Sequence, residues 1–233
     1  MITKVTITGA DDSINPIDLI SLSEKYPFVE WGILVSKKNF GTKRYPSMKW
    51  LSELYKIKEQ FNIKLSCHLC GMYVRELLSG NDIALKDLSD LWNIFERVQI
   101  NFHSIPHNYN TNMINILLEN NSKEFIFQYD DVNIELLNLA YKSGVNCSAL
   151  YDLSGGNGIL PDVWNKPLEN IKCGYAGGLS PDNIEEEINI INYVVGNINT
   201  WIDMETHVRT NNDLLFDLNK VEKCLKISSK YIM

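Results

Sequence analysis

The fold of this chain is decided by residues 171–184, IKCGYAGGLSPDNI, which contain one complete transition from strand to helix. The run from 171 to 176 is short and apolar, as in a buried strand, and Gly177-Gly178 follow it. Ser180-Pro181 then supply a capping hydroxyl and a first-turn proline, with acidic residues behind them. The stretch predicts a strand followed at once by a helix over Pro181–Val195, which is the repeating unit of a parallel sheet.

The same alternation of a short apolar run with a longer segment of helical period extends over the rest of the chain. We predict eight strands, at Val5–Thr8, Trp31–Ser36, Lys64–His68, Val98–His103, Phe125–Tyr129, Cys147–Asp152, Ile171–Ala176 and Thr200–Met204. The other predicted helices are Ile17–Lys25, Ser47–Gln60, Met72–Leu78, Met113–Glu119, Ile134–Lys142 and Leu218–Lys226. The sixth connection, which holds Val163 and Trp164, has only a helical stub.

Parallel strands with helices outside them form either a closed barrel or an open, doubly wound sheet. The chain has 233 residues, close to the ~250 typical of a closed barrel of eight units. No glycine-rich dinucleotide fingerprint follows the first strand, which weakens the open-sheet alternative. We therefore predict an α/β fold, a parallel eight-stranded (β/α)₈ TIM barrel, in a single domain over residues 1–233.

Composition restricts the partners. Hydrophobic residues make up 45% and charged residues 22%, which are ordinary globular values. The net charge is −7 and the basic residues are dispersed, so we expect no nucleic-acid partner. No apolar stretch approaches ~18 residues and no leader-like segment opens the chain, so we expect a soluble, cytoplasmic protein without a membrane partner. A homodimer is the assembly we expect if one forms.

The five cysteines are odd in number and lie mostly inside apolar runs, which favours a reducing compartment over a disulfide framework. Cys67-His68-Leu69-Cys70 has the spacing of a metal half-site. A structural zinc site needs a second ligand pair at comparable spacing, and the sequence has none. We therefore expect no metal and no cofactor.

In a (β/α)₈ barrel the reactive groups follow the C-terminal ends of the strands. In this chain those positions are strongly polar, and a purely structural barrel does not need carboxylates, imidazoles and an arginine on one face. They therefore predict an active or binding site. In strand order they are Thr8, Asp11 and Asp12; Ser36, Lys37, Lys43, Arg44 and Tyr45; Cys67 and His68; Asn101 and His103; Gln128, Asp130 and Asp131; Asp152 and 154–158; 177–180; and Asp203, Glu205, Thr206, His207 and Arg209.

Several stretches, in order over nearly the whole chain, resemble the phosphoribosylanthranilate isomerase family. The closest match is Ala176–Ile184, which resembles the seventh strand and the phosphate-binding helix start of that family. The others are Val5–Gly9, Thr42–Tyr45, Val98–Ile100, Leu150–Gly158, Ile202–Val208 and Asp217–Val221. The resemblance implies the same barrel and an Amadori rearrangement, in which an aminoaldose becomes an aminoketose.

The resemblance also implies roles for the catalytic residues. Asp152 stands where the family has the general acid that opens the sugar ring. Thr8 stands where the family has the cysteine base, and an alkyl hydroxyl is a very poor base near neutral pH. Asp11, Glu205, His68 or His103 could supply the base instead.

For substrate binding, the resemblance implies that Arg44 holds a substrate carboxylate. Gly156, His103 and Gln128 are further candidate substrate-binding residues. Gly177, Gly178 and Ser180 match the phosphate site, where glycines admit the ligand and a helix N-terminus favours an anion. Thr206 and His207 replace the small residue and glycine that the family has after the eighth strand.

Together these features predict an isomerase of the phosphoribosylanthranilate isomerase type. Its substrate would be a small, anionic aminosugar that carries a phosphate or a carboxylate, altered from that of the family because of Thr8. One alternative is a non-catalytic ligand-binding or regulatory barrel. The other is a metal-assisted epimerase or lyase that uses His68, His103, Asp152 and either Asp203 or Glu205.

Overall fold

A computed structural model describes residues 1–102, 109–130, 133–152, 154–210 and 212–232. Eight parallel strands close into a barrel, each paired with the next along the chain and β8 paired with β1. The strands are β1 (Ile2–Thr8), β2 (Val29–Val35), β3 (Leu65–Leu69), β4 (Arg97–Ile100), β5 (Glu124–Tyr129), β6 (Cys147–Tyr151), β7 (Lys172–Ala176) and β8 (Thr200–Met204). The predicted (β/α)₈ barrel is confirmed.

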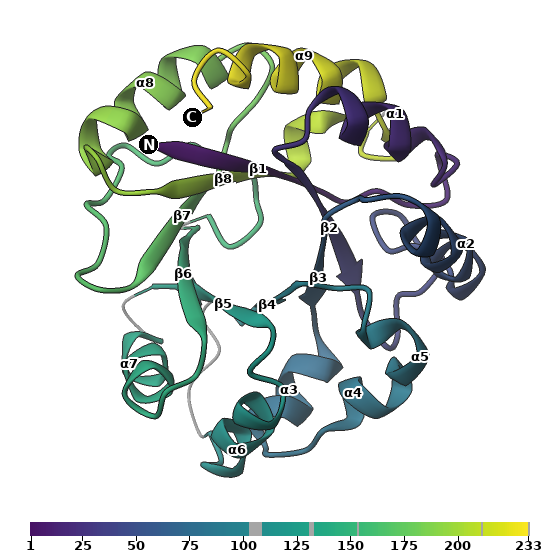
Figure 1. The fold of residues 1–233 in the computed structure, drawn as a ribbon, viewed down its shortest axis with the longest axis vertical. Coiled ribbons are helices and arrows are strands. Elements are labelled where there is room, and N and C mark those ends of the chain that lie inside the picture. The colour runs from purple at the N-terminus through teal and green to yellow at the C-terminus, as the bar shows by residue number, and fades with distance from the viewer. Residues whose placement is uncertain (103–108, 131–132, 153, 211, 233) are drawn as a thin grey trace.

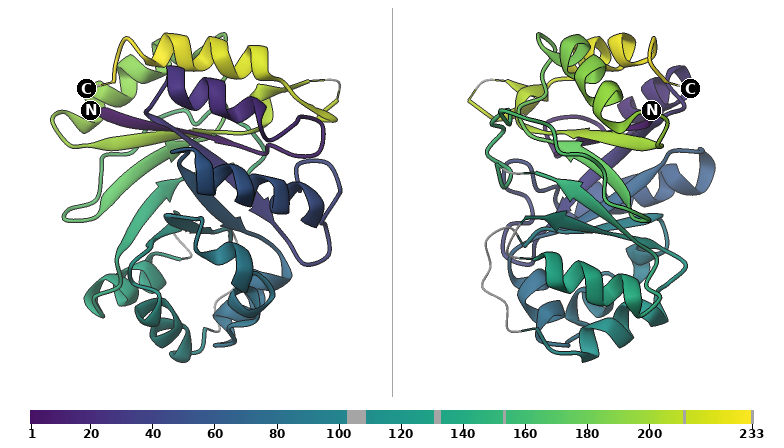
Figure 2. Two further views of the ribbon diagram at one scale, coloured as in Figure 1. Left: turned by 45° about the vertical axis from the view of Figure 1, so that its right-hand side comes forward. Right: turned by 90° about the vertical axis from the view of Figure 1, so that its left-hand side faces the viewer.

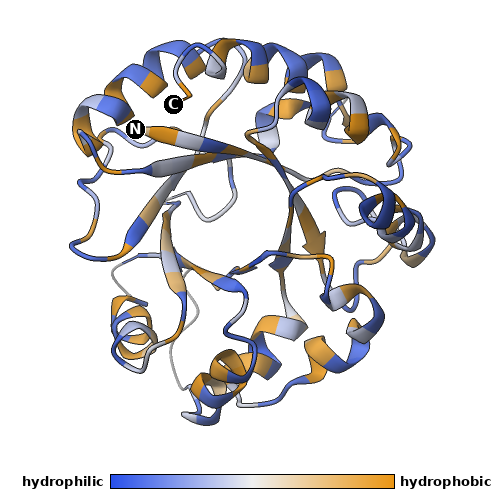
Figure 3. Ribbon diagram, in the orientation of Figure 1, coloured by the Kyte–Doolittle hydropathy of each residue, from blue (hydrophilic) through white to orange (hydrophobic). Residues whose placement is uncertain are grey.

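Helices surround the barrel (Figures 1 and 2). They are α1 (Asp18–Lys25), α2 (Met48–Gln60), α3 (Met72–Leu78), α4 (Ile83–Asp87), α5 (Ser89–Trp92), α6 (Asn112–Glu119), α7 (Ile134–Lys142), α8 (Ile184–Val195) and α9 (Leu218–Ser228). Apolar and polar residues alternate along them (Figure 3), and the buried apolar residues of α8 recur every three or four positions from Ile184 to Val195. That spacing places one apolar stripe against the strands. None of the helices in these ranges has the length and apolar character needed to cross a bilayer.

The elements differ from the prediction in three places. Helix α8 begins at Ile184 instead of Pro181, because residues 181–183 form a turn. Helices α4 and α5 and a small hairpin of β9 (Arg209–Thr210) and β10 (Leu215–Phe216) were not predicted. Between β6 and β7, residues 154–171 contain no helix, in accord with the predicted stub.

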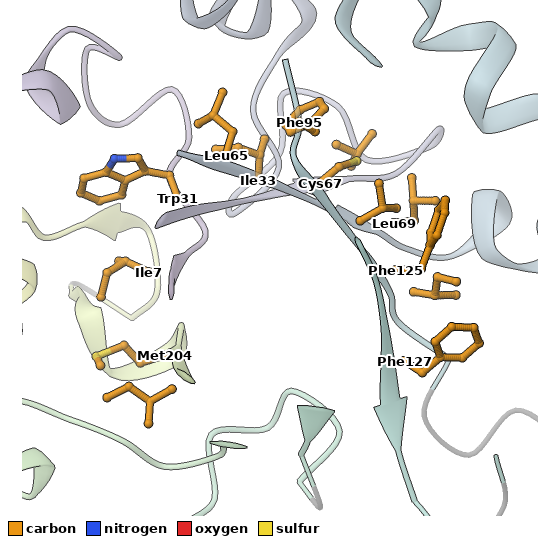
Figure 4. Close-up of a cluster of buried hydrophobic side chains, with 14 of the residues drawn as sticks. Ile7, Trp31, Ile33, Leu65, Cys67, Leu69, Phe95, Phe125, Phe127 and Met204 are labelled. Atoms are coloured by element: carbon orange, nitrogen blue, oxygen red, sulfur yellow. The ribbon is translucent and has the colours of Figure 1, made fainter. Parts of the chain in front are cut away.

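Alternation along β3 separates Cys67 from His68, two residues of the stretch that has the spacing of a metal half-site. Cys67 faces the helices, among Leu65, Ile33 and Phe95 (Figure 4), whereas the neighbouring His68 faces the barrel interior and lines a cavity there. Successive strand residues point to opposite faces, so these two side chains cannot ligate one ion. Within the described ranges, no group of three or more His, Cys, Asp and Glu residues could hold a metal ion.

The N-terminal half of the barrel interior holds a buried ion-pair network, which we call the basal network, formed by Lys4, Glu30, Arg97, Glu124 and Lys172. Arg97 contacts Glu30 at 2.8 Å and Glu124 at 3.0 Å. Burial by itself raises the pKa of Glu30, but the charges and hydrogen bonds of Arg97 and Lys4 outweigh it and lower that pKa to about 2. The basal network is therefore a set of buried charges that compensate one another.

An apolar cluster of Ile126, Leu150, Ala176 and Trp201 borders this network. The Arg97 guanidinium lies 4.4 Å from the centre of the Trp201 ring. Leu150 and Ala176 also line the cavity at the other end of the barrel. The cluster therefore separates the basal network from that cavity.

Candidate active site

A cavity of about 330 Å³ lies at the C-terminal ends of the strands. This volume is at the lower end of the range for small-molecule sites. Its lining comes from β2 to β8 and the loops that follow them, and includes Leu34, Arg44, Tyr45, His68, Cys70, Gln99, Asn101, Gln128, Leu150, Asp152, Ser154, Gly155, Gly156, Gly158, 176–179 and 203–207. The cavity lies where the sequence predicts a site.

Asp152 is held by three hydrogen-bond donors. Its Oδ2 accepts from the Gln128 side-chain amide at 3.0 Å and from the Gly156 backbone N–H at 2.9 Å. Its Oδ1 accepts from the Ser154 hydroxyl at 2.8 Å. Donors on both oxygens are complementary to a carboxylate. Two of the predicted substrate-binding residues, Gln128 and Gly156, thus contact the predicted acid.

Asp203, two residues from the predicted Glu205, is a second carboxyl group in the same cavity. It is 5% exposed, and its Oδ1 accepts a 2.7 Å hydrogen bond from the Thr8 hydroxyl. Burial raises the pKa of Asp203 to about 8; the Thr8 hydrogen bond opposes this rise and the charge of Glu205 adds to it. Asp203 is therefore mostly protonated at neutral pH.

Thr8 itself is 1% exposed and is not among the cavity-lining residues. It packs where β2 has Gly32, since a Cβ there would lie 2.2 Å from the Thr8 Oγ1. The same Cβ would lie 2.9 Å from Nε2 of His68. The structure thus places Thr8 beside the cavity as a partner of Asp203.

Asp11 is also not among the cavity-lining residues. Its carboxylate accepts from Ser13, from the Arg44 backbone N–H at 2.7 Å and from the Arg209 guanidinium at 2.7 Å. Arg44 has φ of 71°, in the left-handed region that non-glycine residues rarely adopt, and the bond to Asp11 holds its N–H there. In this arrangement Asp11 joins the loops after β1, β2 and β8.

The Arg44 side chain does line the cavity, but carboxylates of this chain bind it. Its Nη1 contacts Glu205 at 2.6 Å and its Nε contacts Asp213 at 2.7 Å. Burial raises the pKa of Glu205, the positive charge of Arg44 opposes that rise, and the charge of Asp152 adds to it. The predicted base Glu205 and the predicted carboxylate-binding Arg44 are therefore paired with each other.

Gly177 and Gly178, the double glycine before α8, lie close to the β6–β7 loop. A Cβ on Gly178 would lie 2.3 Å from the Leu160 backbone nitrogen, and one on Gly177 would lie 2.9 Å from the Ile159 carbonyl oxygen. Both glycines have positive φ, 109° at Gly177 and 68° at Gly178. They are thus required where the β6–β7 loop approaches the backbone.

Residues of the turn that precedes α8 form hydrogen bonds with one another. The Ser180 N–H donates to the Asn183 side-chain oxygen at 2.8 Å, and the Ser180 hydroxyl accepts from the Asp182 N–H at 3.3 Å. Ser180 is not among the cavity-lining residues. These two N–H groups, which an anion at this turn would need, already have partners.

Thr206 and His207, at the 3₁₀ turn after β8, contact the same β6–β7 loop. The His207 Nε2 lies 2.8 Å from the Gly158 carbonyl oxygen. A Cβ on Gly158 would lie 2.7 Å from the Thr206 Cβ. His103, the remaining predicted substrate-binding residue, lies outside the described residues.

Sequence reasoning did not select Gln99, and it offered His68 as a candidate base or metal ligand and not as a substrate-binding residue. They are paired in register on β3 and β4, and both line the cavity. Gln99 lies between Val98 and Ile100, so one polar residue in an apolar strand is the signal that could have found it. Burial lowers the pKa of His68 to about 3, so its imidazole is neutral.

The fold and this cavity define a (β/α)₈ barrel of the kind found in many enzymes. Many solved structures resemble the chain, including three enzymes. A phosphoribosyl anthranilate isomerase from Thermococcus kodakaraensis shares 16% identity, with a TM-score of 0.53 over 97% of this chain and 98% of that one. A phospho-2-dehydro-3-deoxyheptonate aldolase from Thermotoga maritima shares 10%, with a TM-score of 0.60 over 99% of this chain and 69% of that one. A 3-hexulose-6-phosphate synthase from Salmonella typhimurium shares 10%, with a TM-score of 0.55 over 98% and 100%.

At these identities the likeness shows the fold alone. No model of a known family matches the chain. No curated protein matches it in sequence.

Proposed function

We propose that this chain is an enzyme that isomerises an aldose or aminoaldose to the corresponding ketose by proton transfer between two carboxyl groups. The observation that carries the proposal is that Asp152 and Asp203 line one cavity in opposite environments. Asp152 accepts three hydrogen bonds, whereas burial keeps Asp203 protonated. A protonated carboxyl group can act as an acid, and a carboxyl group whose oxygens face hydrogen-bond donors offers a second group for proton transfer beside it.

In this mechanism Asp203 donates its proton to the sugar oxygen, and Asp152 takes the proton from C2. The electron pair of the C2–H bond forms the C1–C2 double bond of an enediol or enolamine. Asp152 then returns its proton to C1 while the C2 hydroxyl gives its proton to Asp203, which forms the ketose carbonyl at C2 and restores both carboxyl groups. Thr8 orients Asp203 through its hydrogen bond. These roles give Asp152 the base function that the family resemblance assigns to residue 8.

The test follows exchange of the C2 proton of a sugar for solvent deuterium by NMR, which detects proton abstraction even where the isomerisation equilibrium is unfavourable. Asp152→Asn and Asp203→Asn should each lower the exchange rate by about 10²–10⁴-fold, the usual contribution of a general acid or base.

Asp162→Asn is the matched control, since Asp162 is exposed on the β6–β7 loop and does not line the cavity. It should leave the rate unchanged. A loss of less than about tenfold in both site variants would contradict the proposal.

A further inference from the structure

We propose that the cavity binds an uncharged polyhydroxy compound, such as a free sugar, and that His68 and Gln99 recognise its hydroxyl groups. This inference rests on the proposed function and names its substrate class. It replaces the phosphorylated or carboxylated substrate that the sequence predicts. Two independent sets of contacts support it.

The first set is the polar wall formed by β3 and β4. Gln99 Oε1 and His68 Nε2 are buried and make no hydrogen bond to any described residue. The two residues are 5% and 1% exposed, adjacent in register, and both line the cavity. Buried polar groups are rarely left without partners, because each such group forfeits a hydrogen bond that water would supply.

The wall is also electrically neutral. Gln99 donates its amide N–H to Asn101 at 2.8 Å, and Asn101 also lines the cavity. The His68 imidazole is uncharged because burial lowers its pKa to about 3. A neutral imidazole and two amides offer both donors and acceptors, which match sugar hydroxyl groups, and they add no positive charge that would attract an anion.

The second set of contacts occupies the three places where an anion would bind. Glu205 and Asp213 already contact the Arg44 guanidinium at 2.6 and 2.7 Å. A substrate carboxylate would have to displace Glu205 and leave it unpaired beside the ligand. Such a displacement would cost free energy, because both side chains of the pair are mostly shielded from solvent.

At the turn before α8, Asn183 and the Ser180 hydroxyl take up the N–H groups of Ser180 and Asp182, and the Leu160 backbone lies against Gly178. The first turn of α8 carries Glu185, Glu186 and Glu187, which repel an anion from that end of the helix.

At the third place, Thr206 and His207 contact Gly158 of the β6–β7 loop. The basic residues among the described lining are Arg44, His68 and His207. Carboxylates bind Arg44, His68 is neutral, and His207 contacts a carbonyl oxygen. The described lining therefore favours a neutral ligand.

The test compares sugars that differ only in a phosphate. D-ribose and D-glucose are titrated into the full chain against D-ribose 5-phosphate and D-glucose 6-phosphate, with binding followed by saturation-transfer NMR. C2 deuterium exchange is measured on the same samples. At least one free sugar should bind about tenfold or more tightly than its phosphate.

Gln99→Leu should weaken binding of the free sugar by about tenfold, the usual consequence of losing a partner for a ligand hydroxyl group. Ser66→Ala is the matched control. Ser66 lies two residues before His68 on β3, is also buried with an unpartnered hydroxyl, and does not line the cavity. In the unmodified protein, the ring ¹⁵N resonances of His68 should shift when the sugar is added.

The outcomes separate the two proposals. Tighter binding of the phosphates, or binding of neither free sugar, would overturn the inference about substrate class. If the phosphates bind better and exchange their C2 proton in an Asp152-dependent way, the proposed function stands without this inference. If a free sugar binds in a Gln99-dependent way but shows no exchange, the inference stands and the proposed function is wrong.

Discussion

Both halves of the barrel interior contain polar side chains, but the partners of these side chains differ. In the basal network, Arg97 contacts two carboxylates, and Lys4 and Lys172 contact the same two from the other side. In the cavity, Asp203 is kept protonated by burial, and the nearby His68 and Gln99 have unpartnered atoms. In the basal network the charges compensate one another within the chain, whereas in the cavity hydrogen-bonding groups remain available to another molecule.

This contrast follows the division of a (β/α)₈ barrel into a stability face and a reactive face. It also gives the two halves opposite responses to pH. Glu30 has a pKa lowered from 4.5 to about 2, so its contribution to stability is present above about 4.5 and is lost as pH falls through about 2. Asp203 has a pKa raised from 3.8 to about 8, so the folded state loses stability as pH rises between those values.

The largest effect should come from breaking the basal network with Arg97→Met. Arg97 is 2% exposed, and its loss leaves Glu30 and Glu124 buried without their main counter-charge. Removing one partner of a buried ion pair costs about 3–5 kcal/mol. We expect a loss of that size in the free energy of unfolding, measured by urea denaturation at pH 7.

Arg75→Met is the control for Arg97→Met, because Arg75 is exposed on α3. It should change the free energy of unfolding by less than about 0.5 kcal/mol. Equal stability of the two variants would mean that the basal network does not stabilise the fold, and the contrast between the halves would fail.

A smaller effect, of opposite sign, is expected at the cavity end from Asp203→Asn. The asparagine keeps the shape of the side chain and can still accept the Thr8 hydrogen bond, but it does not ionise. Between pH 3.8 and about 8, Asp203 of the wild type keeps its proton in the folded state and is ionised in the unfolded chain. The stability of the wild type therefore falls with rising pH over that window. The free energy of unfolding of Asp203→Asn lacks this dependence on pH.

Between pH 5 and pH 7, we expect Asp203→Asn to gain on the order of 1–3 kcal/mol over the wild type in the free energy of unfolding, at about 1.4 kcal/mol per pH unit. Urea denaturation at both pH values measures this, with Asp162→Asn as the variant that should follow the wild type. Parallel pH dependence of Asp203→Asn and the wild type would show that burial does not hold the proton on Asp203.

The barrel and the location of its cavity were predictable because the information is local. Each strand-to-helix unit carries its own pattern of apolar runs and capping residues, as residues 171–184 show. Eight such units fix the order of the strands, and the C-terminal ends of parallel strands meet at one face. Asp152, Arg44 and Glu205 could therefore be placed at the cavity from the sequence.

The partners of those residues could not be predicted, because they are distant in the chain. Arg44 pairs with Glu205 across 161 positions, and Asp11 with Arg209 across 198. The sequence cannot show that the first pair occupies the expected carboxylate site or that the second removes Asp11 from the cavity. Burial is the other missing quantity, since only the closed barrel shows that Asp203 is 5% exposed and Thr8 1% exposed.

The smallest effect is expected from Thr8→Cys, which restores the residue that the phosphoribosylanthranilate isomerase family has at this position. Burial raises the pKa of the cavity-lining Cys70 to about 11, and Thr8 is more deeply buried than Cys70, at 1% against 9% exposure. A thiol at position 8 beside Asp203 would therefore stay protonated at neutral pH and be a poor base. The places for a substrate phosphate and carboxylate are also filled by residues of this chain.

We accordingly expect the fluorescence of phosphoribosylanthranilate to disappear no faster with Thr8→Cys than with Thr8→Ser or without protein. Isomerisation needs both a base and a substrate held within reach of it, and a misplaced reactant forfeits most of the advantage of orientation. A rate above the uncatalysed one with Thr8→Cys alone would show that the cavity accepts an anionic aminosugar. That result would leave the contrast between the two halves of the barrel unchanged, but it would contradict the neutral substrate inferred from His68 and Gln99.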